Sequence, residues 1–197
     1  ITNVWQAAVG GNGLALLKRL PIFFILAFGA VWLGGQALIT IDLNLLSALL
    51  GVLLVVYGAS GLANYRMTVR AGQESWAGPV IGFINGVFTG MTGSFAFPGV
   101  LYLQALGLKR DELIQAMGIL FTLSTVGVAI SLQSKALLTA ELGVLSAVGL
   151  MPAMLGMVFG QRIRQRMSED VFRRVFLIAL VLLGTYIGVT ALFRYFG

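Results

Sequence analysis

The sequence predicts an all-α polytopic membrane protein, and three observations support this prediction. Of its 197 residues, 58% are hydrophobic and only 10% are charged, whereas a soluble domain has about 45–50% apolar and about 25% charged residues. The mean hydropathy is +0.95. The chain contains neither Cys nor His, which excludes disulfides, thiolate metal sites and the commonest general base. We therefore expect a bundle of membrane-spanning helices.

Uncharged apolar stretches of about 20 residues, each long enough to cross the roughly 30 Å hydrocarbon core as a helix, follow one another along the chain. They lie at Leu20–Ile39, Leu43–Ala63, Leu113–Leu132, Leu138–Phe159 and Val175–Phe193. Residues 1–16 have the composition of the end of a further span. The sequence thus predicts five complete transmembrane helices and part of a sixth.

The uncharged stretch Ala77–Leu108 is longer than one span needs and is interrupted by Gly93, Ser94 and Pro98. It fits either one long kinked helix or a re-entrant hairpin of two short arms over residues 78–107. If it crosses once, the basic residues divide evenly between the two sides. If it turns back, eleven of the 13 basic residues share one side, with Lys135 and Arg194 opposite. Because Lys and Arg in short loops gather on the cytoplasmic face, the charges favour the hairpin.

Two halves of the chain correspond at an offset of 126 residues, which aligns Gly34 with Gly160 and Gly58 with Gly184. A hairpin followed by three spans contains an odd number of crossings, so successive units would be inverted, as in many secondary transporters. The predicted organisation is the end of a first repeat at 1–64, a cytoplasmic loop at 65–77 and a second repeat at 78–197. The first repeat would lack its N-terminal hairpin, so we expect a protein missing roughly its first 40–50 residues, by extension of the repeat.

A ladder of glycines runs along the first arm of the predicted hairpin. Gly78, Gly82, Gly86 and Gly90 recur every four residues, which leaves one helix face smooth enough for the close approach of another helix. Pro98 is expected near the first turn of the second arm. These five residues are predicted to serve packing and the shape of the hairpin.

The tip of the hairpin, at Thr92, Gly93 and Ser94, is the best candidate for a ligand site. Backbone that is not helical is tolerated at membrane depth only inside protein or beside a water-filled cavity. A second arm beginning near Ser94–Phe95 would offer free N–H groups, which carry partial positive charge and bind oxyanions. The hydroxyl groups of Thr92 and Ser94 could donate as well.

Other polar residues lie in the two spans that we expect to flank the tips. The predicted substrate-binding set therefore also includes Thr2, Asn3, Gln6, Gln115 and Thr122. Hydrogen bonding between helices accounts for any one of these residues equally well. Asn85 is open to both interpretations.

The glycine ladder ending in GMTGSFAFP, followed by YLQALGLKRDELIQAMGILFTLS, resembles the TauE/SafE family of sulfite and organosulfonate exporters. The resemblance covers essentially the whole chain, with Ile1–Asn64 similar to the end of the family's first repeat. At the tip, Ser94, Phe95 and Ala96 stand where the family is often richer in glycine. The resemblance implies export of a small sulfur oxyanion or sulfonate through the bacterial inner membrane by a multi-pass protein.

Two other kinds of function were weighed against export. Transport of another small anion, by uptake or exchange, fits the same features, and a membrane scaffold or assembly protein would need only the packing glycines. An enzyme is not expected, because no mid-span carboxylate, His or Cys is present to act as nucleophile, base or metal ligand. No cofactor, metal or nucleic acid is expected, and the partners are a small anion and the lipid bilayer. The oligomeric state is left open, with a homodimer as one option.

Overall fold

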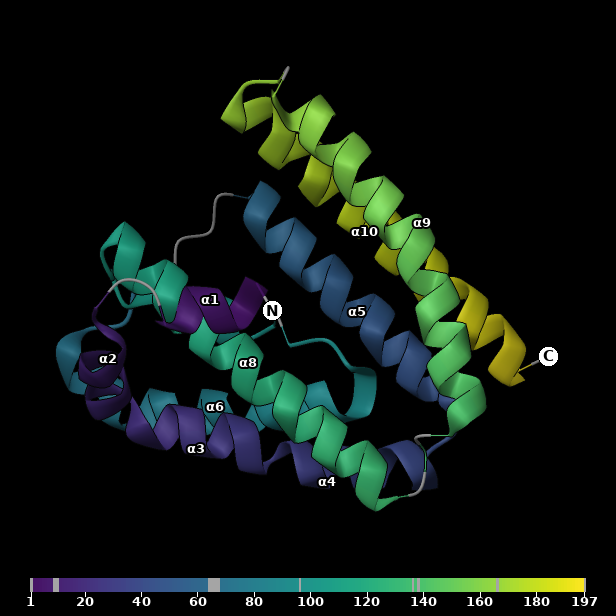
Figure 1. Cartoon of the computed structure of the whole chain (residues 1–197), viewed down its shortest axis with the longest axis horizontal. Helices are drawn as coiled ribbons and strands as arrows, with labels where there is room; N and C mark the ends of the chain where they lie inside the picture. Colours follow the sequence, from purple (N-terminus) through teal and green to yellow (C-terminus); the bar gives the residue numbers. More distant parts are fainter. Residues whose placement is uncertain are drawn as a thin grey trace.

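The computed structural model describes residues 2–8, 11–63, 68–95, 97–135, 137, 139–165 and 167–196. Within these ranges every regular element is helical (Figure 1). The α-helices are α1 Thr2–Ala8, α2 Gly13–Arg19, α3 Pro21–Gly29, α4 Val31–Thr40, α5 Leu43–Leu62, α6 Glu74–Thr92, α7 Gly99–Ala105, α8 Arg110–Ser134, α9 Ala140–Gln165 and α10 Glu169–Phe196. One 3-10 turn, Ala71–Gln73, precedes α6.

The all-α polytopic fold class is confirmed. Four helical stretches of the described chain are long and apolar enough to cross a membrane, namely Pro21–Thr40, Leu43–Leu62, Arg110–Ser134 and Asp170–Phe196. A shorter apolar helix runs over Glu141–Gly156 within α9. The four match four of the five predicted spans to within about five residues, and the fifth, Leu138–Phe159, contains only the shorter helix. The predicted boundary between residues 64 and 65 lies outside the described residues, as do Arg66, Ala96 and Arg166.

Two predicted continuous helices are broken in the structure. The partial span at residues 1–16 consists of α1 and α2, because Gly11 takes a φ of +72°, a left-handed conformation that ends helices and suits glycine. The span at Leu20–Ile39 is divided into α3 and α4 at Ala30. This joint carries small side chains and lies against Gly86 of α6, so a break there still packs closely.

The stretch around the glycine ladder turns back on itself. The backbone N–H of Val69, ahead of α6, donates to the carbonyl of Ala105 at the end of α7 over 2.9 Å. The chain therefore enters and leaves this element at one end, as the loop charges predicted. The two arms are unequal, because α6 has 19 residues and α7 has only seven. The first arm also begins earlier than expected, at Glu74.

The glycine face of α6 lies directly against the backbones of α3 and α4. A Cβ built at Gly82 would lie 2.5 Å from the carbonyl oxygen of Phe23, and one at Gly86 would lie 2.7 Å from that of Ala27. A Cβ at Gly90 would fall on the carbonyl of Val31. Because no side chain separates the helices at these points, main chain touches main chain along most of α6.

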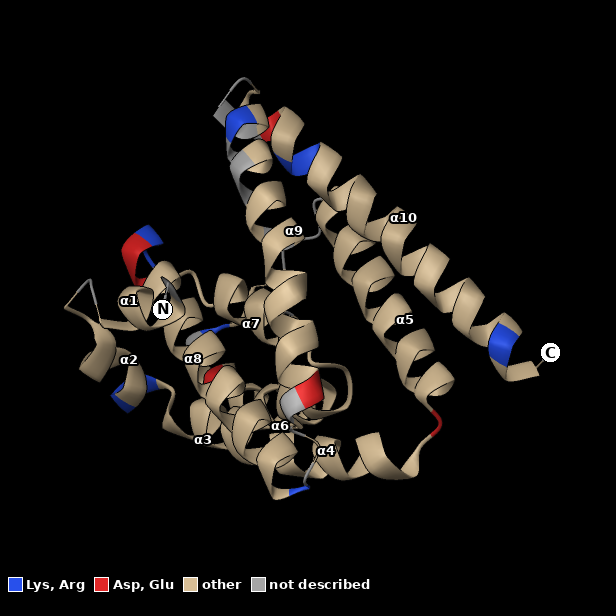
Figure 2. Cartoon of the chain, turned by 45° about the vertical axis from the view of Figure 1, so that its right-hand side comes forward, with Lys and Arg blue, Asp and Glu red and all other residues tan. Residues whose placement is uncertain are grey.

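A second close pair is formed by α5 and α10, which lie beside each other in Figure 1. Gly51 and Gly184 face each other, and a Cβ built on either would lie within 2.6 Å of the carbonyl oxygen of the other. The glycines of α9 differ, since Gly149 and Gly156 have no atom within 4 Å of an added Cβ. Charged residues gather near the ends of the helices (Figure 2). The middles of the helices are therefore apolar, as a membrane requires.

Gly86→Ala should destabilise the packing of α6 on α3, because its new methyl group would lie 2.7–2.9 Å from two backbone carbonyls and the Ala30 side chain. Overpacking of this kind costs about 1–3 kcal/mol. We expect a lower midpoint of thermal unfolding for the purified protein in detergent. Gly149→Ala is the matched control and should not lower it, since the site is open and Ala favours helix. Equal midpoints for the two variants would contradict the close packing of α6.

Candidate functional site

The tip of the hairpin is shaped by the last turn of α6. Gly93 ends the helix with a φ of +71°, and its N–H donates to the carbonyl of Thr89 over 2.8 Å. The hydroxyl of Thr89 donates to the carbonyl of Ser94 over 3.3 Å, and the N–H of Ser94 donates to Oγ1 of Thr92 over 3.2 Å. The non-helical backbone is therefore held by side chains of the helix that it leaves.

The second arm is anchored to the first by Asn85. Its Oδ1 accepts a hydrogen bond from the N–H of Gly99, the first residue of α7, over 2.9 Å. Asn85 is 0% exposed, and Oδ1 would lie 2.7 Å from a Cβ at Gly99. Only glycine brings the start of α7 this close to α6.

This anchor corrects the prediction for the second arm. The arm begins at Gly99 rather than near Ser94–Phe95, and Asn85 already occupies its first N–H group. The N–H of Ser94 is occupied by Thr92, whose own hydroxyl donates to the carbonyl of Phe88 over 2.7 Å. The helix N-terminus therefore lies five residues beyond the predicted start, and the N–H groups of Ser94 and Gly99 are both occupied. Among the described residues, none pairs with the half-buried Ser94 hydroxyl.

The tip lies beside the middle of α8. The rings of Phe95 and Phe121 pack with centroids 4.9 Å apart, and Leu120 approaches within 2.9 Å of a Cβ built at Gly99. Thr122 is the next residue of α8, and its hydroxyl donates to the carbonyl of Gly118 over 2.7 Å. The tip and the middle of α8 are thus in contact, through residues outside the predicted binding set.

The same part of α8 also receives α1. A Cβ built at Gly118 would lie 2.6 Å from the backbone nitrogen of Ala7 and 2.7 Å from Cβ of Gln6. Gln6 is exposed and Asn3 is half-buried. Thr2 begins α1, and its side chain lies outside the described part of the structure. The tip and α1 therefore each pack on the middle part of α8, at Phe121 and Gly118 respectively.

Gln115 holds two segments of this site in place. It is 1% exposed, its Nε2 donates to the carbonyl of Ala7 over 2.9 Å, and its Oε1 accepts from the N–H of Asn12 over 3.0 Å. These two bonds bridge the end of α1 and the start of α2. The amide is thereby engaged in positioning α1 on α8, which is the second of the two interpretations that the sequence left open for it.

Three polar residues near the tip are buried, and of these the sequence drew attention only to Asn85. Asn85, Thr89 and Ser124 are all completely buried, and Nδ2 of Asn85 and Oγ of Ser124 have no hydrogen-bond partner in the described structure. Asn85 and Thr89 are four residues apart and share a face of α6. Polar residues at that spacing in an apolar helix were the available signal, which the glycine ladder obscured. No cluster of three or more Asp and Glu side chains that could hold a metal occurs among the residues described.

Asn85→Leu should loosen the hairpin, because the buried N–H of Gly99 would lose its acceptor. An unsatisfied buried donor costs about 1–3 kcal/mol. We expect a lower unfolding midpoint together with slower solute flux in proteoliposomes. Ser60→Leu is a suitable control, because the Ser60 hydroxyl bonds only within its own helix, to Tyr57 over 2.8 Å. Unchanged stability of Asn85→Leu would show that Asn85 does not anchor α7.

The family model described as "Sulfite exporter TauE/SafE" matches residues 1–187. No curated protein and no solved structure matches the chain significantly. Because the match extends over nearly all of the chain, the protein belongs to the TauE/SafE sulfite exporter family. It is a multi-pass membrane protein and a membrane transporter.

Proposed function

We propose that this transporter exports a small sulfur-containing anion, sulfite or an organosulfonate, across the bacterial inner membrane by alternating access. The observation that carries the proposal is the re-entrant hairpin, whose non-helical tip packs on Phe121 of α8, the helix on which α1 packs at Gly118. Such backbone at membrane depth is tolerated beside protein or water, and discontinuous helices form the substrate sites of many secondary transporters. The family description supports the choice of sulfur anion.

The tip suits an anion that must be bound and then released. The stretch Ala77–Leu108 contains no charged residue, so the available contacts are the Ser94 hydroxyl and nearby polar groups. Neutral donors form weaker bonds to oxyanions than charged ones, by a factor of about two. A binding site built from dipoles therefore holds the anion without trapping it.

Alternating access requires two halves that can exchange roles, and the packing of α5 on α10 supports this part of the proposal. A Cβ at Gly58 would lie 2.7 Å from Cγ2 of Val181, and a Cβ at Gly184 would lie 3.0 Å from Cγ2 of Val55. Gly58 and Gly184 are 126 residues apart, and so are Val55 and Val181. The two contacts are therefore exchanged by the offset that aligned the halves of the sequence. We propose an inverted repeat in which these helices form a pair related by a two-fold axis.

Purified protein in proteoliposomes should carry radiolabelled sulfite or taurine at a saturable rate above that of protein-free vesicles. If only another small anion, such as acetate, is carried, the substrate assignment is wrong and the transport mechanism stands. If no anion is carried, a scaffold or assembly role becomes the better explanation.

Ser94→Leu should reduce anion flux by at least about tenfold, since it replaces the available tip hydroxyl by a larger apolar group and leaves an incoming oxyanion without that donor. The side chain is half-buried, so the variant is expected to insert normally. Ser94 is preferable to Gly93 for this test, because any side chain at Gly93 would also strain its left-handed backbone.

Thr185→Leu is the matched control for the tip. It removes the hydroxyl of an exposed residue on α10, which bonds only to the carbonyl of Val181 in its own helix. Flux should stay within about twofold of the parent, because such an exposed change has little effect on folding. Equal flux for the two leucine variants would place the site elsewhere.

A further inference from the structure

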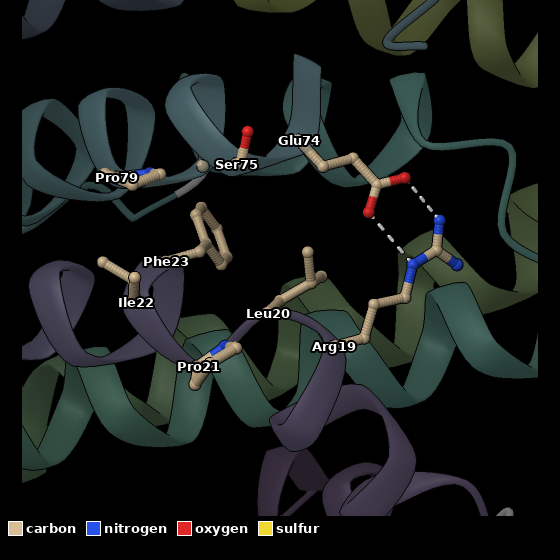
Figure 3. Close-up of a pocket in the computed structure, with 9 residues that line it drawn as sticks. Arg19, Leu20, Pro21, Ile22, Phe23, Glu74, Ser75 and Pro79 are labelled. Atoms are coloured by element: carbon tan, nitrogen blue, oxygen red, sulfur yellow. Dashed lines mark hydrogen bonds and ion pairs between the residues drawn. The ribbon is translucent and has the colours of Figure 1, made fainter. Parts of the chain in front are cut away.

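A second polar site lies away from the tip, between the α2–α3 junction and the start of α6 (Figure 3). It is a pocket of about 230 Å³, which suits a ligand of a few heavy atoms. Residues Arg19 to Phe23 line one wall. Glu74, Ser75, Gly78 and Pro79 line the other.

The mouth of the pocket holds an ion pair between α2 and α6. Nη2 of Arg19 donates to Oε1 of Glu74 over 2.6 Å, and Nε donates to Oε2 over 3.1 Å. The two parallel bonds form the forked arrangement that guanidinium makes with planar carboxylates and with tetrahedral oxyanions. Hydrogen bonding to Glu74 raises the pKa of Arg19 above its ordinary value, so the guanidinium is charged at any physiological pH.

The guanidinium is the more exposed member of the pair. The Arg19 side chain is 43% exposed and that of Glu74 is 16% exposed. Water screens the partly exposed Arg19 guanidinium and weakens its attraction to the Glu74 carboxylate. A second oxyanion can therefore compete with the Glu74 carboxylate for the same two N–H donors.

A buried hydroxyl without a partner lies beside Gly78, one of the residues that line the pocket. Tyr102, on α7, is 1% exposed, and its hydroxyl has no hydrogen-bond partner in the described structure. That oxygen would lie 2.9 Å from a Cβ built at Gly78, which lines the pocket. The Tyr102 ring is fixed by Phe23, with centroids 5.0 Å apart.

We propose that this pocket is an entry site for the transported oxyanion, in which Arg19 binds the anion and Glu74 is a built-in competitor that occupies Arg19 until the anion displaces it. This inference rests on the proposed transport of a small oxyanion. Arg19 lies on the side where the sequence places eleven of the 13 basic residues. A surface of that sign concentrates anions at its clefts.

The two members of the ion pair should affect anion affinity in opposite directions. Arg19→Gln should raise the KM for sulfite by about tenfold or more, because charge-assisted bonds to the anion are lost. Glu74→Gln should lower the KM several-fold, because the competing carboxylate is removed from the guanidinium. The measurement is the initial flux from the face with the basic loops, at a series of sulfite concentrations. Dissociation constants for sulfite from calorimetry of the purified protein should move in the same way.

Two further variants separate binding from folding and from general charge. Lys18→Gln removes one positive charge at an exposed neighbouring position and should leave the KM within about twofold, since a solvated charge contributes little. The double variant Arg19→Gln/Glu74→Gln leaves no unpaired charge and should keep the raised KM of Arg19→Gln. Thermal unfolding midpoints are recorded for every variant.

A purely structural ion pair would behave differently, since loss of either partner would then lower stability and maximal flux together. Changes in the KM of the same sign for Arg19→Gln and Glu74→Gln, or no change in either, would overturn the entry site. Failure of the transport proposal is distinguishable, because the parent protein would then carry no sulfite or sulfonate at all. In that case the dissociation constant for sulfite from calorimetry is the only test of the entry site. An unchanged dissociation constant for Arg19→Gln would reject the pocket as an anion site.

Discussion

The arrangement of the hairpin depends on direct contact between the backbone of α6 and those of α3 and α4. Lipid tails are as apolar as leucine, so burial of apolar side chains does not drive helices together in a membrane. Close packing and backbone approach must do so instead. Gly82, Gly86 and Gly90 meet carbonyl oxygens of the facing helices, and this contact continues over about three turns. Every polar group of the hairpin takes its position from that contact.

Once α6 is fixed in this way, its polar face determines where the chain can leave the helix. Asn85 and Thr89 are fully buried, and each bonds to backbone beyond the end of α6, at Gly99 and Ser94 respectively. A free N–H or carbonyl at this depth would cost several kcal/mol, in the absence of water. The side chains of one arm thus satisfy the main chain of the tip and of the other arm. This arrangement lets an irregular backbone persist beside α8, with Phe95 packed on Phe121.

Hydropathy and loop charge were sufficient to predict the helical membrane fold and the turning back of the hairpin, because both depend on composition and on the bilayer itself. The finer features depend on partners that are distant in sequence. Gln115 reads as a ligand-binding residue in isolation, yet its amide is engaged by Ala7 and Asn12, more than 100 residues away. The start of the second arm at Gly99 follows from Asn85, which no local propensity reveals. The break at Ala30 likewise reflects the fit of α3 and α4 to α6. The roles of Thr92, Ser94 and the polar residues of α1 in binding stay predictions.

The positions of the charged and neutral donors follow from the cost of desolvation. A guanidinium at the bilayer centre costs roughly 2.5–3.5 kcal/mol on insertion scales. Arg19 is instead partly exposed at the mouth of the pocket and is paired with Glu74, so the desolvation cost of its charge is small. The tip lies in a stretch without any charge and can offer only hydroxyl and backbone dipoles. In the proposed pathway the anion is first selected by a strong donor where water still screens it. The anion then passes to the weaker donors of the tip. Water no longer screens electrostatic interactions there, so each hydrogen bond to the anion is stronger than it would be in water. Affinity is thereby kept moderate at both places, since screening limits the first site and the neutrality of the donors limits the second.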